Sequence, residues 1–338
     1  MLRIAVNGYG RIGRGIVRAL FENNYRDRIQ VVAINELADL ATVSYLTRYD
    51  STHGRFPFEV TTHSDSGKDY LQIDGETIRV FNQPDVQALN WHDLDVDVVL
   101  ECTGAFQDRS TAELHIRNGA SKVLFSQPAS SDVDATVVYG VNHHSLTGEE
   151  VIVSNASCTT NCIIPVLKVL DDSYGIVCGT ITTIHSAMND QPVIDAYHSD
   201  LRRTRSAGQS IIPVDTGLAA GIERVLPEFK DAFVALHMRV PTQNVSLMDL
   251  TVELSSEVDV ERLNQTLSQA SKNGLAGVLG YTEEPHASID FNHDSRSGIV
   301  DGTQTRVVNG KMAKLVVWFD NEWAFANRML DTALTMGA

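Results

Sequence analysis

The chain has 338 residues, of which 43% are hydrophobic, so it is long enough to bury a large core and to form two domains. Its formal net charge is −16 and its pI is near 5.0. An acidic protein repels nucleic-acid phosphates and acidic membrane surfaces, so we expect no nucleic-acid partner. A small anionic substrate remains compatible with this charge where local arginines counter the field.

No apolar run approaches the roughly 20 residues that cross a bilayer, and residues 1–6 read as a strand rather than a signal peptide. We therefore expect a soluble, cytoplasmic protein with no membrane partner. Its four cysteines should stay reduced in that compartment. Cys158 and Cys162 stand four residues apart and lack the spacing and the histidine partners of a zinc site, so we expect no metal.

The first 150 residues alternate short β-branched runs with an amphipathic helical pattern, which is typical of parallel βαβ units. This half of the chain is predicted to form a Rossmann-type, nucleotide-binding α/β domain. The predicted strands cover residues 2–7, 29–34, 96–102, 122–125 and 136–139, and a predicted helix covers residues 12–22.

The pattern changes from about residue 176, where long alternating strands favour a mixed or antiparallel sheet in an α+β catalytic domain. These strands cover residues 179–185, 232–240 and 245–254. Residues 190–210 are polar and rich in arginine, and they predict a long ordered loop of the functional kind.

The last predicted element is a helix over residues 321–336, with Trp323, Phe325, Met329 and Leu330 at its apolar positions. We expect it to complete the cofactor domain. The predicted division is therefore a cofactor domain of residues 1–157, completed by residues 320–338, and a catalytic domain of residues 158–319.

A glycine-rich sequence follows the first strand, with Gly8, Gly10 and Gly13 in a Gly-x-Gly-x-x-Gly pattern. Such glycines allow a tight turn, close approach of a pyrophosphate and close packing of the next helix. Glu36 follows the second strand, where its carboxylate can accept hydrogen bonds from an adenosine ribose and would repel a 2′-phosphate. The pattern predicts NAD rather than NADP, while a plain strand-to-helix turn is the alternative for the glycines alone. The predicted cofactor site also includes Arg11 and Ile12.

A polar run over residues 154–162 precedes the apolar residues 163–167, which indicates a loop leading into a helix. A cysteine at such a helix start is expected to have a lowered thiol pKa, which favours the nucleophilic thiolate. Pro165 is expected in the first turn of this helix. By composition alone, Cys158 is a buried structural cysteine as readily as a nucleophile.

Four segments resemble glyceraldehyde-3-phosphate dehydrogenases, and the resemblance runs nearly from end to end. They are SNASCTTNC (154–162), YDSTHGRF (49–56), RVPTQNVSLMDLTV (239–252) and WFDNEWAFANRM (318–329). Within that superfamily, three segments resemble the erythrose-4-phosphate dehydrogenase branch more closely. These are NASCTTNCIIPV, TIHSAMNDQPVIDAYHSDLRRTR and SIDFNHDSRSGIVDGTQTRV.

The resemblance implies a catalytic pair, in which the thiolate of Cys158 attacks an aldehyde and His185 serves as the base. The products of that step are an enzyme thioester and NADH. Asn321 would hydrogen-bond the nicotinamide amide. Arg239 would hold one phosphate, and a second anion site used in deacylation would be formed by Ser157, Thr159, Arg203, Thr216 and Gly217.

Two departures from the glyceraldehyde enzymes accompany this resemblance: Met188 replaces a common threonine that contacts the substrate phosphate, and Phe325 replaces a common tyrosine. Met188 favours oxidation of D-erythrose 4-phosphate to 4-phosphoerythronate, which in the family feeds pyridoxal 5′-phosphate biosynthesis, with water resolving the thioester. The alternative is a phosphorylating glyceraldehyde-3-phosphate dehydrogenase. The family is tetrameric, and residues 190–210 resemble its subunit-facing loop, so a homotetramer is expected.

Two other classes of function fit the sequence less well. A cysteine hydrolase would have no need of the dinucleotide motif. A non-catalytic NAD-binding protein would have no need of Cys158, His185 and Arg239 together.

Overall fold

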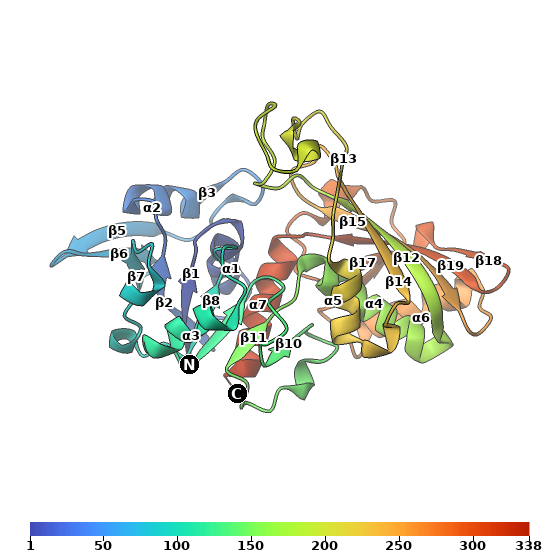
Figure 1. The fold of residues 1–338 in the computed structure, drawn as a ribbon, viewed down its shortest axis with the longest axis horizontal. Coiled ribbons are helices and arrows are strands. Elements are labelled where there is room, and N and C mark those ends of the chain that lie inside the picture. Colours follow the sequence, from blue (N-terminus) through green and yellow to red (C-terminus); the bar gives the residue numbers. More distant parts are fainter. Residues whose placement is uncertain (338) are drawn as a thin grey trace. The chain divides into compact units, whose positions relative to one another are not determined.

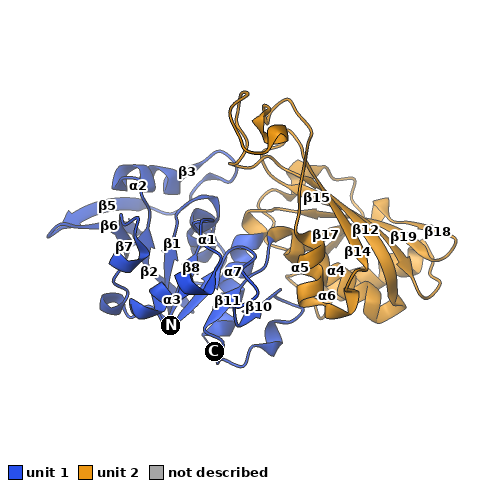
Figure 2. Ribbon diagram, viewed as in Figure 1, with its two compact units in different colours: residues 1–157, 325–338 blue, residues 158–324 orange. Residues whose placement is uncertain are grey.

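A computed structural model places residues 1–337 (Figure 1). The chain divides into two compact units, one of residues 1–157 with the segment that starts at Phe325, and one of Cys158–Ala324 (Figure 2). Within residues 1–337, no helix has both the length and the apolar character that a membrane crossing requires. All four cysteines are free thiols.

The first unit is built on a nine-stranded sheet in the order β10-β11-β9-β8-β1-β2-β7-β6-β5. The strands from β10 to β7 are parallel, whereas β6 and β5 extend the sheet antiparallel. This is a Rossmann-type sheet, as predicted. Its strands are β1 (Leu2–Asn7), β2 (Ile29–Asn35), β5 (Val60–Asp65), β6 (Lys68–Ile73), β7 (Glu76–Phe81), β8 (Val98–Glu101), β9 (Lys122–Phe125), β10 (Ala135–Thr136) and β11 (Ile152–Ser154).

Helices pack on this sheet because its central strands are apolar on both faces, as parallel strands between two helical layers are. Along α1 (Arg11–Glu22), Ile16, Val17 and Leu20 are fully buried. Gly15 of α1 lies against Ala326 in the first turn of α7 (Trp323–Met336), so the two helices pack beside each other. The unit also contains α2 (Leu40–Arg48), α3 (Arg109–Arg117) and the hairpin of β3 (Tyr49–Asp50) and β4 (Gly54–Arg55).

The second unit contains an eight-stranded sheet in the order β13-β14-β12-β15-β19-β17-β16, with β18 also paired to β19. The sheet is mixed, as predicted, because β12 is parallel to β14 and antiparallel to β15. Its strands are β12 (Ile176–His185), β13 (Ile212–Val214), β14 (Phe233–Arg239), β15 (Ser246–Leu254), β16 (Leu279–Thr282), β17 (Gly298–Asp301), β18 (Arg306–Val308) and β19 (Met312–Phe319). Its helices are α4 (Cys158–Tyr174), α5 (Leu218–Val225) and α6 (Val260–Lys272).

Among the predicted element boundaries that differ from the structure, two lie next to side-chain contacts with the backbone. The predicted strand at 136–139 stops at Thr136, because the side-chain amide of Asn142 donates to the Thr136 carbonyl and accepts from the Val138 N–H. The final helix begins at Trp323, two residues after the predicted start at 321, and the Asp320 carboxylate accepts the Trp323 N–H next to its N-terminus.

Two further predictions concern α4 and the long loop. Pro165 lies inside α4, beyond its first turn, so the expectation that it opens the helix is wrong. Residues 190–210 form a loop, as predicted, interrupted by one short 3-10 helix at Leu201–Thr204.

Candidate active site

The glycine-rich loop joins β1 to α1, and two of its glycines are required by the fold itself. Gly8 has φ +91°, and a Cβ there would lie 2.6 Å from the backbone nitrogen of Thr103. A Cβ on Gly13 would lie 2.1 Å from the Gly8 carbonyl oxygen. Gly10 differs, because a Cβ on it would meet no atom within 4 Å. The space beside Gly10, at the N-terminus of α1, is therefore open to a bound anion such as a pyrophosphate.

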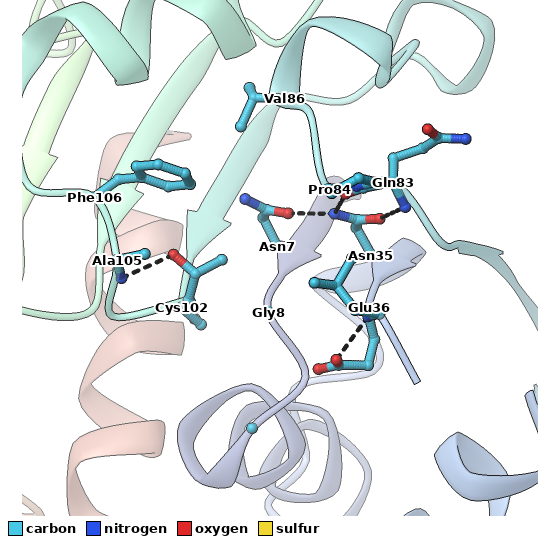
Figure 3. A pocket seen from close by; sticks show the side chains of 13 residues that line it. Asn7, Gly8, Asn35, Glu36, Gln83, Pro84, Val86, Cys102, Ala105 and Phe106 are labelled. Carbon is cyan, nitrogen blue, oxygen red and sulfur yellow. Dashed lines mark hydrogen bonds between the residues drawn. The ribbon is translucent and has the colours of Figure 1, made fainter. Parts of the chain in front are cut away.

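A pocket of about 360 Å³ lies at the carboxyl ends of β1, β2 and β8 (Figure 3). Gly8, Gly10 and Glu36 line it, together with the apolar side chains of Val86 and Phe106. Apolar walls suit a base and a carboxylate suits ribose hydroxyls, so the residues present fit an adenine dinucleotide.

Glu36 holds the rim of this pocket through backbone contacts. Its Oε2 accepts the Tyr9 N–H at 2.9 Å, and its Oε1 accepts the Leu37 N–H at 2.7 Å. Oε1 also accepts the Ala38 N–H at 3.4 Å, so the further lone pair for a hydroxyl donor is on Oε2. The carboxylate thus also fixes the glycine-rich loop, a role that the sequence did not indicate.

Of the residues predicted on the glycine-rich loop, Arg11, Ile12 and Gly13 do not line the pocket. The Arg11 guanidinium pairs instead with the carboxylate of Asp50. Burial raises the pKa of Asp50, but the hydrogen bond from Arg11 lowers it, and the pKa of this carboxyl lies well below its ordinary range. Arg11 and Ile12 lie in the first turn of α1, and Gly13 packs against the Gly8 carbonyl.

In the second unit, Cys158 and His185 face each other. Cys158 is the first residue of α4 and His185 the last of β12, and their Sγ and Nε2 atoms lie 3.9 Å apart. His185 Nδ1 lies 2.8 Å from the carbonyl oxygen of Ser186, which can only accept. Nδ1 therefore carries the proton, and the lone pair of Nε2 points to the thiol. This is the tautomer that can act as a base.

The pKa values of this pair favour two neutral groups. Burial raises the pKa of the Cys158 thiol to about 11, against the opposing charge of Arg239. Burial, and secondly the charge of Arg239, lower the pKa of His185 to about 4. The expectation that the helix start lowers the thiol pKa is therefore wrong in this structure, because removal of the sulfur from water outweighs the helix N–H groups.

Arg239 is the buried cation of the site. The β12–β14 register pairs His185 with Arg239, and its Nη1 lies 3.5 Å from His185 Nδ1. The Arg239 side chain is buried, and its Nε has no hydrogen-bond partner among residues 1–337. A buried guanidinium with an unused donor is suited to an anionic oxygen, as the predicted phosphate contact requires.

The predicted second anion site is only partly assembled. Arg203 forms ion pairs with Asp190 at 2.7 Å and Asp200 at 3.3 Å, so a phosphate would compete with two carboxylates. Its positive charge nevertheless contributes to the lowered pKa of Arg239, which places the two arginines within electrostatic range.

The hydroxyl and backbone groups predicted for that anion site lie at two helix starts. Thr159 is in the first turn of α4, and Gly217 is the N-cap of α5, next to Thr216. A Cβ on Gly221 would lie 3.1 Å from Thr160 Oγ1, so α5 packs against the beginning of α4. Ser157 precedes α4 and belongs to the first unit.

Asn321 is held by two serines. Its Oδ1 accepts the hydroxyls of Ser186 at 2.9 Å and Ser246 at 2.8 Å, and the Ser246 oxygen accepts the Ser186 N–H. Because Oδ1 faces the serines, the Asn321 NH₂ group points away from them. An amide NH₂ held in this way suits the acceptor oxygen of a nicotinamide amide.

Two family models match the chain. The model described as the NAD binding domain of glyceraldehyde 3-phosphate dehydrogenase matches residues 2–109, and the model described as its C-terminal domain matches residues 157–321. Together they span most of the sequence. The chain belongs to the glyceraldehyde-3-phosphate dehydrogenase family. It is an NAD-dependent oxidoreductase that acts on an aldehyde group, which confirms the predicted class of enzyme and cofactor.

Three residues of the candidate sites in this dehydrogenase were not predicted from the sequence: His237, Ser186 and Ser246. The His237 ring lies 4.8 Å from the His185 ring, and alternation along β14 places it on the same face as Arg239. That alternation was a usable signal. For Ser186 and Ser246 no signal existed, because their contacts with Asn321 join residues 75 or more positions apart.

Proposed function

We propose that this dehydrogenase oxidises D-erythrose 4-phosphate to 4-phosphoerythronate through a thioester on Cys158. The observation that carries the proposal is the pair of Cys158 Sγ and His185 Nε2, 3.9 Å apart, with the His185 tautomer fixed as a base. The buried guanidinium of Arg239 next to this pair suits the phosphorylated end of the substrate or the charge that develops on its oxygen.

His185 transfers protons twice in the first half of this reaction. Its Nε2 takes the Cys158 proton as the sulfur adds to the aldehyde carbon, and returns it to the carbonyl oxygen to give a hemithioacetal. It then takes the hydroxyl proton as the thioester carbonyl forms. NAD supplies the acceptor for the hydride that leaves that carbon.

Water resolves the thioester in the second half. His185 first releases the hydroxyl proton to solvent, which restores the lone pair of Nε2. It then removes a proton from the attacking water, the carbon–sulfur bond breaks, and the Cys158 sulfur regains that proton from His185 as the acid leaves. Met188 supports the substrate preference. Its side chain is exposed, and it stands at the position where the glyceraldehyde enzymes commonly have a threonine. A thioether cannot donate the hydrogen bond that a threonine hydroxyl gives to phosphate.

The second candidate is the phosphorylating reaction, in which inorganic phosphate attacks the thioester of glyceraldehyde 3-phosphate. It is favoured by the helix starts at Thr159 and Gly217, because the N-terminus of a helix suits an anion.

The two candidates differ in substrate and in the need for phosphate. We expect kcat/KM to be higher for D-erythrose 4-phosphate than for glyceraldehyde 3-phosphate, and independent of added phosphate. The product should be 4-phosphoerythronate. A preference for glyceraldehyde 3-phosphate, with a rate that depends on phosphate, would favour the second candidate.

We also propose that the protein assembles as a homotetramer. The face of the second sheet opposite its helices exposes Val177, Val234 and Leu236, and the loop over residues 190–210 exposes Val193 and Tyr197. Apolar side chains grouped in this way are typical of surfaces that are covered in an assembly.

A further inference from the structure

A chain of buried hydrogen bonds lies beside the pocket of the first unit. It joins five side chains, those of Trp91, His115, Glu101, Asn7 and Asn35, and none of them is more than 6% exposed. His115 comes from α3, and Asn7, Asn35 and Glu101 end the neighbouring strands β1, β2 and β8. Asn7 and Asn35 line the pocket, whereas Glu101 lies behind them and does not.

The protonation of His115 follows from its neighbours. Trp91 Nε1 can only donate, and it lies 3.1 Å from His115 Nδ1, so that nitrogen carries a lone pair. The proton of the neutral ring is therefore on Nε2, which lies 3.2 Å from Glu101 Oε2. A doubly protonated ring would place two donors face to face at Trp91.

Glu101 is where the donors converge. Its Oε2 also accepts the Asn7 amide at 2.6 Å, and its Oε1 accepts both the N–H of Thr103, at 2.9 Å, and the Thr103 hydroxyl. Four donors are therefore directed at its two oxygens, so the carboxylate is the common acceptor of the network.

This carboxylate sets the direction of every amide that follows. Because Asn7 Nδ2 donates to Glu101, Asn7 Oδ1 faces Asn35 and accepts its Nδ2 at 2.8 Å (Figure 3). Asn35 Oδ1 then accepts the Gln83 N–H at 2.9 Å. Asn7, Asn35 and Thr103 line the pocket, so the orientation of these three side chains is fixed before a ligand arrives.

We propose that Glu101 and His115 are positioning residues for NAD: they orient the Asn7, Asn35 and Thr103 side chains that line the cofactor pocket, without touching the cofactor. The inference rests on the assignment of this pocket to NAD. A pocket whose polar atoms are already oriented binds its ligand without a further ordering cost, so loss of the converging carboxylate weakens binding.

The direct test is Glu101→Gln. This variant keeps the size of the side chain, but its NH₂ group replaces one carboxylate oxygen and faces the N–H and O–H donors that the oxygen had accepted. We expect the Kd for NAD, measured by titration calorimetry, to rise about tenfold, the effect of one hydrogen bond to a charged group. The kcat at saturating NAD should change less than about threefold, because Cys158 and His185 are untouched. Glu113→Gln, which alters an exposed carboxylate on α3, is the matched control and should bind NAD as the wild type does.

A pair of variants at His115 separates positioning from plain packing. In His115→Gln the NH₂ group takes the place of Nε2 and can still donate to Glu101, whereas the shorter amide of His115→Asn takes the place of Nδ1 and cannot. We expect the Gln variant to keep its Kd for NAD within about threefold, and the Asn variant to weaken it about as much as Glu101→Gln. If Glu101→Gln does not fold, the difference in Kd between the two His115 variants tests the positioning role on its own.

Equal Kd values for the two His115 variants, or wild-type affinity in a folded Glu101→Gln variant, would overturn the positioning role. Gly8→Ala, titrated with NAD in the same way, separates failure of the positioning role from failure of the assignment of the pocket to NAD. The Cβ of this variant would meet the Thr103 backbone at the pocket. If Gly8→Ala weakens NAD and Glu101→Gln does not, only the positioning role fails. If Gly8→Ala also binds NAD normally, the pocket assignment fails, and the inference with it.

Discussion

Cys158 and His185 meet as a neutral thiol and a neutral imidazole, because burial raises the pKa of Cys158 to about 11 and lowers that of His185 to about 4. The reactive thiolate is therefore a minor species near pH 7. It must be generated as the aldehyde arrives, by proton transfer to Nε2 across the 3.9 Å contact.

This neutral pair predicts the pH dependence of thiol reactivity in the enzyme without ligands. The rate of Cys158 alkylation by iodoacetamide should rise about tenfold per pH unit between pH 7 and 10, because the thiolate fraction does so below the pKa. Peptide mapping assigns the modified cysteine. A rate that is already at its plateau at pH 7 would show a preformed thiolate and contradict the neutral pair.

Replacement of His185 by Asn tests the base directly. We expect kcat to fall by about 10²- to 10⁴-fold, the usual contribution of a positioned base. The Kd for NAD should be unchanged, since the cofactor pocket lies among residues of the first unit. A loss confined to NAD affinity, with kcat intact, would argue against His185 as the base.

The pairing of β12 with β14 places two histidines side by side in the interior, with ring centroids 4.8 Å apart. Burial is the main cause of the low pKa of His237, about 3, and the charges of His185, Arg239 and Arg203 lower it further. The two strands therefore hold both imidazoles neutral in the folded protein.

These depressed pKa values predict a loss of stability in acid. As the pH falls below 6.5, His185 and His237 bind protons in the unfolded chain but stay neutral in the folded protein. Their contribution to the free energy of unfolding is therefore most favourable above pH 6.5 and declines toward pH 4. Each histidine contributes a slope of up to about 1.4 kcal/mol per pH unit. Urea unfolding of the His237→Gln variant between pH 7 and 4.5 should show a shallower decline than the wild type; identical slopes would show that His237 is not held neutral.

Elements with a strong local pattern could be predicted from the sequence, and those that depend on distant partners could not. Residues 2–7 and 122–125 are strands as predicted, because apolar runs next to glycine or helix signals determine them locally. The antiparallel strands β5 and β6 were missed, since β5 has mostly exposed, polar side chains and is held by its pairing with β6.

The same division applies to the sites. Gly8 and Glu36 could be found from their spacing, and both line the cofactor pocket. The engagement of Arg11 with Asp50 could not, because an ion pair across 39 residues leaves no trace in local spacing. The thiol pKa was mispredicted for a related reason: helix position is visible in a sequence, but depth of burial is not.

At the scale of the whole molecule, the proposed tetramer has a simple test. Leu236 is 52% exposed on β14, on the face of the sheet opposite the helices. We expect light scattering after size exclusion to give the mass of a tetramer for the wild type and a smaller species for Leu236→Glu, because a buried charge destabilises an apolar interface. A monomeric wild type would refute the proposed assembly.

The central claim is that Cys158 carries the aldehyde through oxidation, and the most direct measurement is NADH absorbance after mixing NAD with D-erythrose 4-phosphate. We expect an aldehyde-dependent rise with the wild type and none with Cys158→Ala, while calorimetry shows that the variant still binds NAD with wild-type affinity. Oxidation by the Cys158→Ala variant at the wild-type rate, or the absence of any aldehyde-dependent rise with the wild type, would contradict it.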